Sequence, residues 1–190
     1  MVKLDFKKNI AVFISGRGSN FKNLFKFSKN KKSSYKIKLV VSNKPQAKGI
    51  QFAKKNRIKN YIIEEKQPIF EKKVIKIIKE NKVEILCLAG FMRILSPNFI
   101  KKIKIPIINI HPSLLPKLKG LNTHERAIKA KHKFSGCTVH FVNEKLDSGK
   151  IIAQKKVKIL KSDNPTTLAK KVLRLEHQIY PEALEKIINF

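Results

Sequence analysis

The chain has 190 residues, a length at which a single folded domain spanning residues 1–190 is expected. Hydrophobic residues make up 42% of it, which provides enough apolar material for a core and excludes a disordered chain. The formal net charge of +30 at pH 7 would attract polyanions, but the lysines that carry it are spread along all the predicted helices, so we expect attraction of anionic small molecules and no dedicated nucleic-acid surface.

The first half of the chain alternates between strand-like and helix-like segments. Residues 10–15 (IAVFIS) form a short, continuous apolar run, which is typical of a strand buried on both faces. Apolar residues at helical spacing follow over residues 21–28. The alternation continues with strands predicted at residues 37–42, 60–63 and 84–89, and with helices at residues 47–55 and 70–79.

The next segments show clear helix-start signals. Ser96 is predicted to cap a helix in which Pro97 takes the first position. A fifth strand is predicted at residues 107–110, and Thr123 is predicted to cap a helix over residues 123–130.

The C-terminal segments predict a hairpin and a closing helix. Residues 138–142 and 151–157 have strand-like patterns, and the turn between them, residues 143–150, contains glycine. Residues 166–188 have the pattern of one long helix, in which we expect Pro181 to cause a break or a kink.

Repeated strand–helix alternation predicts an α/β fold with a doubly wound, mainly parallel sheet. The C-terminal hairpin is expected to add an antiparallel edge to this sheet. The sequence shows no internal repeat, low-complexity linker or step in composition, which again favours one domain. Ligands of such sheets bind at the carboxyl ends of the strands, so residues that follow strands are the candidates for function.

The sequence carries no sign of export or membrane insertion. Residues 1–9 are charged and the apolar run after them is brief, which does not fit a signal peptide, and no apolar run approaches about 18 residues. Cys87 and Cys137 lie in or beside apolar runs without metal-ligand spacing, so we expect buried, reduced thiols. These features predict a cytoplasmic enzyme without a metal site.

A glycine-containing loop, residues 15–20 (SGRGSN), joins the first strand to the first helix. Backbone N–H groups of such a loop, together with the helix dipole, can receive a phosphate, and Ser19 and Asn20 can add donors or cap the helix. Phe21 stands where a dinucleotide fingerprint needs its third glycine, and the Lys-Ser/Thr pair of an ATP-binding loop is missing. The pattern therefore favours one small phosphate over NAD or ATP, with a plain capped turn as the structural alternative.

The fifth strand ends in a pair of polar side chains. Alternation along the strand places Asn109 and His111 on one face, and Pro112 and Pro116 stiffen the segment that follows. An amide can donate to a developing oxyanion, and an imidazole can hold or transfer a proton near neutral pH. We therefore predict a catalytic pair here, against the alternative of a histidine bonded in a structural turn.

A histidine in such a role needs a group that orients it. The turn at residues 143–149 offers two acids, Glu144 and Asp147, and the residue pattern does not choose between them. Three other histidines have plainer interpretations. His140 is interpreted as a satisfied core or rim residue, His132 as solvated, and His124 as part of a helix start.

Several segments, in order and over nearly the whole chain, carry a family pattern. They are residues 14–20 (ISGRGSN), 40–50 (VVSNKPQAKGI), 88–97 (LAGFMRILSP), 108–120 (INIHPSLLPKLKG), 123–128 (THERAI), 136–154 (GCTVHFVNEKLDSGKIIAQ) and 175–181 (LEHQIYP). The two most specific motifs among them are LAGFMRILSP and NIHPSLLP. Together these segments resemble the folate-dependent glycinamide ribonucleotide formyltransferase family.

The resemblance implies a Rossmann-like formyltransferase fold that binds phosphate on one side and folate on the other. It implies transfer of the formyl group of 10-formyltetrahydrofolate to the amine of 5'-phosphoribosylglycinamide, a step of purine biosynthesis that needs no metal. It also implies small-molecule substrates as the partners of a monomer or homodimer.

The resemblance also assigns roles by position. The substrate phosphate would bind at Gly18, Ser19 and Asn20, and the glycinamide at Leu173, Arg174, Leu175 and Glu176, with Glu176 nearest the amine. Folate would bind at Met92, Arg93, Ile94, Leu95, Asn109, Asn143, Glu144, Lys145, Leu146 and Asp147. The catalytic trio would be Asn109, His111 and Asp147, so that the resemblance chooses Asp147 over Glu144.

The chain departs from the family pattern at a few places. Lys66 and Gln67 stand where the family commonly has an arginine that touches folate, so a different grip on the folate tail is expected. Asn122 replaces the first histidine of the usual GLHTH. Related enzymes that formylate methionyl-tRNA carry a further RNA-binding domain, for which we expect no room before Phe190.

Overall fold

The computed structural model of the protein describes residues 7–189. Within them, one seven-stranded sheet has the strand order β3-β2-β1-β4-β5-β6-β7. The first five strands run parallel, whereas β6 pairs antiparallel with both β5 and β7. The strands are β1 (Lys8–Ile14), β2 (Tyr35–Ser42), β3 (Lys59–Ile62), β4 (Ile85–Leu88), β5 (Ile107–His111), β6 (Phe134–Phe141) and β7 (Ile151–Lys158). The predicted parallel sheet with an antiparallel edge is confirmed.

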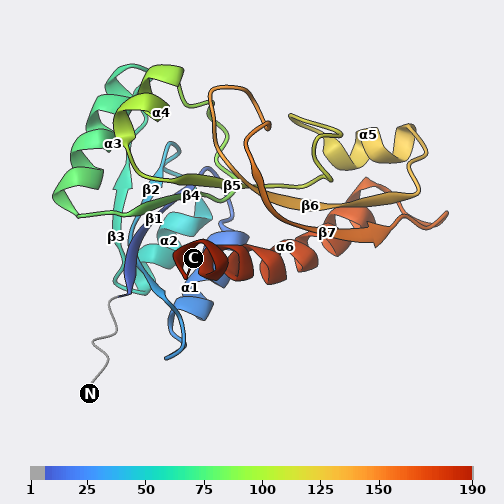
Figure 1. Ribbon diagram of the computed structural model, residues 1–190, viewed down its shortest axis with the longest axis horizontal. Helices are drawn as coiled ribbons and strands as arrows, with labels where there is room; N and C mark the ends of the chain where they lie inside the picture. Colours follow the sequence, from blue (N-terminus) through green and yellow to red (C-terminus); the bar gives the residue numbers. More distant parts are fainter. Residues whose placement is uncertain (1–6, 190) are drawn as a thin grey trace.

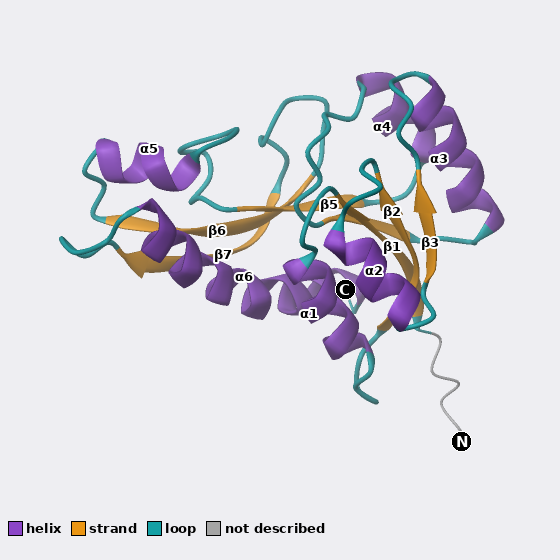
Figure 2. Ribbon diagram, turned by 180° about the vertical axis from the view of Figure 1, so that it is seen from behind, coloured by secondary structure: helices purple, strands orange, loops and turns teal. Residues whose placement is uncertain are grey.

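Helices cover both faces of this sheet (Figures 1 and 2). They are α1 (Ser19–Ser28), α2 (Lys48–Lys55), α3 (Ile69–Glu80), α4 (Pro97–Ile103), α5 (Thr123–Lys129) and α6 (Pro165–Ile188). Side chains of α1, α2 and α6 share one core cluster, and side chains of α3 and α4 share the other. Strand β1 contributes to both, because alternate residues of a strand point to opposite faces: Val12 joins the first cluster and Phe13 the second.

The strand β6 begins four residues earlier than the sequence predicts, at Phe134. Gly136 lies in this extension, and an isolated glycine inside a strand often marks a bulge or the close approach of another backbone. In the structure a Cβ on Gly136 would lie 2.1 Å from the carbonyl oxygen of Lys155 in β7. The glycine is therefore there because the two strands approach too closely for a side chain.

Pro181 lies inside α6 without interrupting it, so the predicted break is wrong. Proline removes the N–H that would bond to the carbonyl of residue 177, four positions earlier. That carbonyl instead accepts a hydrogen bond from the side-chain amide of Asn23 in α1. A neighbouring helix thus satisfies the group that the proline leaves free.

Of the two helix caps predicted at Ser96 and Thr123, the structure confirms the first and corrects the second. Ser96 caps α4 as predicted, because its hydroxyl accepts a hydrogen bond from the Phe99 N–H at 3.1 Å. Thr123, in contrast, is the first helical residue of α5, and the capping position belongs to Asn122. Asn122 has a left-handed backbone (φ 56°), a conformation that asparagine tolerates better than most residues.

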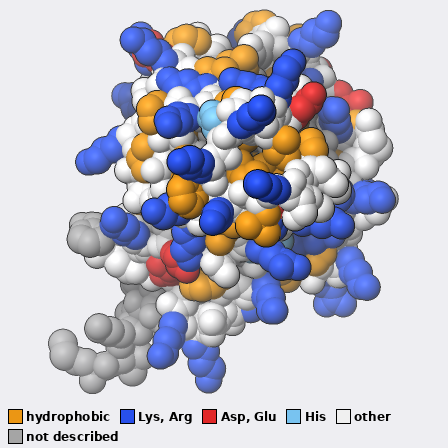
Figure 3. Space-filling model, turned by 90° about the vertical axis from the view of Figure 1, so that its right-hand side faces the viewer, with side chains coloured by type: hydrophobic (Ala, Val, Ile, Leu, Met, Phe, Trp, Pro, Cys, Tyr) orange, Lys and Arg blue, Asp and Glu red, His pale blue; other side chains and the backbone are white. Residues whose placement is uncertain are grey.

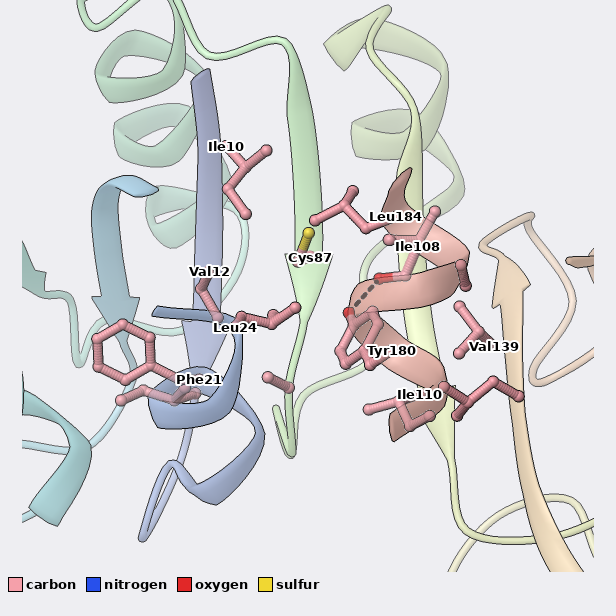
Figure 4. Packing of buried hydrophobic residues seen from close by; sticks show 14 of the residues in the cluster. Ile10, Val12, Phe21, Leu24, Cys87, Ile108, Ile110, Val139, Tyr180 and Leu184 are labelled. Atoms are coloured by element: carbon pink, nitrogen blue, oxygen red, sulfur yellow. Dashed lines mark hydrogen bonds between the residues drawn. The ribbon is translucent and has the colours of Figure 1, made fainter. Parts of the chain in front are cut away.

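The helix α6 is anchored to the sheet by Tyr180, which is fully buried. Its hydroxyl lies 2.9 Å from the carbonyl oxygen of Leu88 in β4 and 3.3 Å from that of Ile108 in β5. Figure 4 shows this ring among the apolar side chains of β1, β4, β5 and α6, with the contact to Ile108 drawn. One side chain of α6 therefore contacts the last residue of β4 and the second residue of β5.

The face of the molecule that Figure 3 shows is basic, without a continuous basic stripe. On the face that Figure 3 shows, Lys and Arg side chains are scattered around hydrophobic ones, and acidic side chains are few. None of the helices within residues 7–189 is long and apolar enough to cross a membrane. In the same residues there is no cluster of three or more His, Cys, Asp or Glu side chains that could hold a metal ion.

Candidate active site

A cavity of about 650 Å³ lies at the carboxyl ends of β4 and β5. It is lined mainly by the loop 90–95 after β4, the end of β5, the segment 120–124 before and at the start of α5, and the segment 142–147 after β6. Single side chains from β4, β6, α1, α4 and α6 complete the lining. This is the edge of the sheet at which the strand order predicts a ligand site.

His111 is the last residue of β5 and is buried beneath this cavity. Its Nδ1 lies 3.4 Å from a carboxylate oxygen of Asp147, and its Nε2 lies 2.9 Å from the carbonyl oxygen of Leu118. Each ring nitrogen therefore faces an oxygen acceptor, so a ring protonated on both nitrogens can donate to both. The ring is held between the β6–β7 loop on one side and the segment after β5 on the other.

Asp147 reaches His111 because of the conformation of the loop between β6 and β7. Its backbone is left-handed (φ 46°), and its carboxylate accepts a hydrogen bond from the Gly120 N–H at 2.9 Å. Glu144, the other acid in this loop, pairs instead with Lys101 of α4 at 3.3 Å. Of the two acids that the residue pattern left open, the structure brings Asp147 to the histidine.

Within residues 7–189 the side chain of Asn109 is hydrogen-bonded to His140 and not to His111: its amide nitrogen lies 3.2 Å from Nε2 of His140. The two residues are opposite each other in the β5–β6 pair. The Nδ1 of His140 lies 2.8 Å from the carbonyl oxygen of Phe141, which fixes a tautomer with the proton on Nδ1. Its Nε2 then accepts from the amide of Asn109 and orients it.

His140 thus belongs to the site, although the sequence placed it in the core or at its rim. It is buried and satisfied, as expected, but it also lies 3.7 Å from the carboxylate of Asp147. Alternation along β6 shows that Thr138 and His140 share a face, but the sequence does not reveal which residue of β5 they oppose. Only the register between β5 and β6 in the structure shows that His140 lies opposite Asn109.

Acid should destabilise the protein partly through His140. Burial lowers the pKa of His140 below its usual value of 6.5, and the nearby His111 lowers it further, against the Phe141 carbonyl and Asp147, which raise it. The unfolded chain therefore binds this proton more readily than the folded one, and stability falls as the pH drops below about 6.5. Between about pH 7.5 and pH 5.5, we expect the melting temperature of a His140→Gln variant to fall less than that of the unmodified protein.

Calorimetry of the two proteins across this range checks the prediction. Burial also lowers the pKa of His124 and of His177 and raises that of Glu176, but these groups are present in both proteins. Their contributions cancel in the difference. Parallel curves for the two proteins would contradict the assignment of a depressed pKa to His140.

The glycine loop after β1 is shaped by close backbone contact. Gly18 has a left-handed backbone (φ 68°), and a Cβ added to it would lie 3.0 Å from the Cα of Gly49 at the start of α2. Ser19 and Asn20 are the first two residues of α1. Of the three residues predicted to hold a phosphate, Asn20 lines the cavity.

Asn20 is joined to Glu176 of α6, which also lines the cavity. The amide nitrogen of Asn20 donates to the Glu176 carboxylate at 2.6 Å, and the amide oxygen has no partner within residues 7–189. Burial raises the pKa of Glu176, and the hydrogen bond from Asn20 opposes this rise. The other three predicted glycinamide contacts are not among the residues that line the cavity: Leu173, Arg174 and Leu175.

Asn109 and the nine other residues predicted to bind folate all line the cavity. Met92 and Ile94 are largely exposed there, whereas Leu95 is buried. The Arg93 guanidinium is turned away: it donates to the carbonyl oxygens of Glu64 and Glu65 and lies 5.0 Å from the ring centroid of Phe70.

Gln67 stands where the family pattern has arginine, and its side chain bonds to the loop 90–95 that lines the cavity. Its amide nitrogen donates to the Glu71 carboxylate at 2.8 Å and to the carbonyl oxygen of Ile94 at 2.6 Å. Glu71 in turn accepts from the N–H and the hydroxyl of Ser96. Gln67 therefore helps to hold the backbone of the loop 90–95 in place.

His124 is a further residue of the cavity that sequence reasoning missed. It is half-buried, its Nδ1 has no partner within residues 7–189, and it lines the same cavity as His111. Burial lowers its pKa, and the charge of His111 adds to the effect. Its place at a helix start is correct, but helix capping does not account for its position.

The loop that carries Asp147 depends on Gly149. A Cβ on Gly149 would lie 1.8 Å from the carbonyl oxygen of Phe141, a backbone atom that cannot move without shifting β6. We expect Gly149→Ala to lower the free energy of unfolding by about 1–3 kcal/mol. A Lys150→Ala control, at an exposed position, should stay within about 0.5 kcal/mol of the unmodified protein. Urea unfolding of all three proteins tests this, and equal stability of the two variants would contradict it.

The sequence matches the family described as formyl transferase over residues 8–184. The chain belongs to this family. Phosphoribosylglycinamide formyltransferase of Bacillus subtilis (strain 168) is 37% identical over 186 residues, which cover 96% of this chain and 95% of that protein. The structure is similar to a solved phosphoribosylglycinamide formyltransferase from Anaplasma phagocytophilum, with a TM-score of 0.90, 41% identity and coverage of 96% of this chain and 88% of that one.

Longer members of the formyl transferase family also match. The trifunctional purine biosynthetic protein adenosine-3 of Gallus gallus is 43% identical over 187 residues, which cover 96% of this chain. The chain spans only 19% of the length of that relative. The present chain has the formyl transferase fold of the solved structures, including the predicted parallel sheet and its antiparallel edge.

Proposed function

We propose that this formyl transferase is a phosphoribosylglycinamide formyltransferase. It would transfer the formyl group of 10-formyltetrahydrofolate to the amine of 5'-phosphoribosylglycinamide, a reaction of purine biosynthesis. The single observation that best supports this is the cavity in which His111, Asp147 and Asn109 meet an acid–amide pair, Asn20 and Glu176. The names of full-length relatives agree with it.

The dimensions and lining of the cavity suit two small substrates. Its volume of about 650 Å³ lies within the range of about 300–1,000 Å³ that is usual for small-molecule sites. The loop 90–95 offers apolar side chains and backbone polar groups to a flat, heteroaromatic ring such as that of folate. The opposite end offers Asn20 and Glu176, of which the unpartnered amide oxygen and the carboxylate suit an amine.

The chemistry follows from the groups that face the cavity. The neutral amine of the glycinamide attacks the formyl carbon, so a C–N bond forms and the formyl oxygen becomes an oxyanion. The Asn109 amide and the His111 ring stabilise this oxyanion, which is worth about 3–4 kcal/mol for one well-placed donor. The C–N bond to the folate nitrogen then breaks, and that nitrogen takes up the proton that the amine loses.

His140, Asp147 and Leu118 prepare the two donors. His140 directs the amide of Asn109, and Asp147 holds one nitrogen of His111. The other nitrogen of His111 faces the Leu118 carbonyl, so donation to the oxyanion exchanges that contact for the substrate oxygen. The Asn109 amide is thus a preformed donor that needs little reorganisation in the transition state, whereas Nε2 of His111 must first leave the Leu118 carbonyl.

Glu176 would act on the amine. A carboxylate whose pKa burial raises is a better proton acceptor than an exposed one, and it lies beside Asn20, where the glycinamide would enter. The phosphate of the same substrate would lie at the glycine loop and the start of α1, at Gly18, Ser19 and Asn20. We place the reaction in the cytoplasm and expect small molecules, without metal or nucleic acid, as the partners of a monomer or homodimer.

The test is an absorbance assay for tetrahydrofolate release with both substrates. The purified protein should turn over 5'-phosphoribosylglycinamide and should not formylate methionyl-tRNA under the same conditions. Mass spectrometry of the product should show the added formyl group. Absence of folate turnover with glycinamide ribonucleotide, in a protein with a sharp melting transition, would sink the proposed function.

A further inference from the structure

Ser15 lies between two loops that border the cavity. It is the first residue after β1, an interior strand of the sheet, and its side chain is buried. The glycine loop, residues 16–18, begins at the next residue and leads into α1. The loop 90–95, which lines the cavity, follows β4, the strand paired with β1.

The Ser15 hydroxyl joins the ends of three adjacent strands. Its Oγ accepts a hydrogen bond from the Met92 N–H at 2.7 Å, after β4. The same hydroxyl donates to the side-chain oxygen of Asn43 at 2.6 Å, just after β2. The backbone N–H of Ser15 donates to the Gly90 carbonyl oxygen at 3.1 Å. One residue thus ties the start of the glycine loop to the start of the loop 90–95.

Both bonds of this hydroxyl are short; the one to Asn43 is buried, and the one from the Met92 N–H is partly buried. Asn43 is buried like Ser15, and a hydrogen bond in such surroundings is stronger than in water. Alanine at position 15 would leave the Met92 N–H without its acceptor and the Asn43 oxygen without its donor. A buried group left unpaired is costly, so we expect the two loops to shift until these groups find other partners.

We propose that Ser15 is a positioning residue that keeps the glycine loop and the loop 90–95 in register, so that both substrates meet in reacting distance. This inference rests on the proposed function, which puts the phosphate-bearing substrate at the first loop and folate at the second. Transfer needs the amine nitrogen and the formyl carbon about 3–3.5 Å apart, and a shift of about 1 Å can cost about a hundredfold in rate.

The test compares Ser15→Ala with the unmodified protein under steady-state conditions. We expect kcat/KM to fall about tenfold or more for each of the two substrates, with both KM values raised. A merely structural role would reduce the folded fraction and leave KM unchanged. The matched control is Ser28→Ala, which also removes a buried serine hydroxyl, but one that bonds within α1, to the Phe25 carbonyl at 2.7 Å. It should keep both KM values.

A second measurement reads the contact itself and needs no turnover. Amide hydrogen exchange at Met92 should be faster in Ser15→Ala and close to unmodified in Ser15→Thr, which keeps a hydroxyl. A raised KM for only one substrate, or for neither, would overturn the coupling of the two loops, as would unchanged exchange at Met92. Lack of turnover in the unmodified protein refutes the proposed function instead, and the exchange result then decides the role of Ser15 alone.

Discussion

The His111→Ala variant should turn over substrate at least about 100-fold more slowly than the unmodified protein, with a much smaller change in either KM. In the proposed mechanism the imidazole donates a hydrogen bond to the reacting oxygen. Its removal takes away stabilisation that exists only once the oxyanion has formed, so kcat should fall rather than affinity. Steady-state assays of folate release measure both quantities.

Two controls make this result specific. The matched variant is His132→Ala, a histidine outside the cavity that holds His111, which should keep full turnover. The melting temperature of His111→Ala also has to be measured, because the ring is buried and contacts Leu118 and Asp147. Turnover within a few fold of the unmodified protein, in a folded variant, would remove His111 from the mechanism.

The Asp147→Asn variant should lose about 100-fold in turnover while keeping its fold. Asparagine has the same shape and tolerates the left-handed backbone found at this position (φ 46°). The substitution removes the negative charge that faces His111 at 3.4 Å and leaves an amide that can still accept from Gly120. A loss of rate therefore reports the charge and the orientation of the ring, and not a collapsed loop.

Glu144→Gln is the natural comparison for this variant, because both acids lie in the same loop. The carboxylate of Glu144 pairs with Lys101 and not with a histidine, so its effect on turnover should be at least about tenfold smaller. Equal losses in the two variants would mean that the general charge of the loop matters, and the assignment of Asp147 as the partner of His111 would be wrong.

Much of the fold could be predicted from local patterns. Continuous apolar runs marked β1 and β4, and the alternation of strands with helices marked the parallel sheet. These signals depend on a residue and its near neighbours, through the periods of about 2 and 3.6 residues that strands and helices impose. The same period placed Asn109 and His111 together, and both line the cavity.

Features that depend on a partner far along the chain could not be predicted in this way. The break expected at Pro181 is wrong because Asn23, in another helix, bonds to the carbonyl that the proline leaves free. The first four residues of β6 were not predicted, and the close approach of β7 that excludes a side chain at Gly136 is seen only in the structure. In both cases the deciding contact is tertiary.

The sequence by itself determined the order of the strands and helices and the polar pair at the end of β5, because these follow from side-chain periodicity along one stretch of chain. The residue pattern left Asp147 and Glu144 open and the resemblance chose Asp147, which the tertiary structure brings to His111. The tertiary structure alone decided that His140 orients Asn109 and that Asn20 meets Glu176. Each of these contacts requires a loop conformation, a strand register or a helix packing that brings distant residues within about 3–4 Å. No local pattern specifies that geometry.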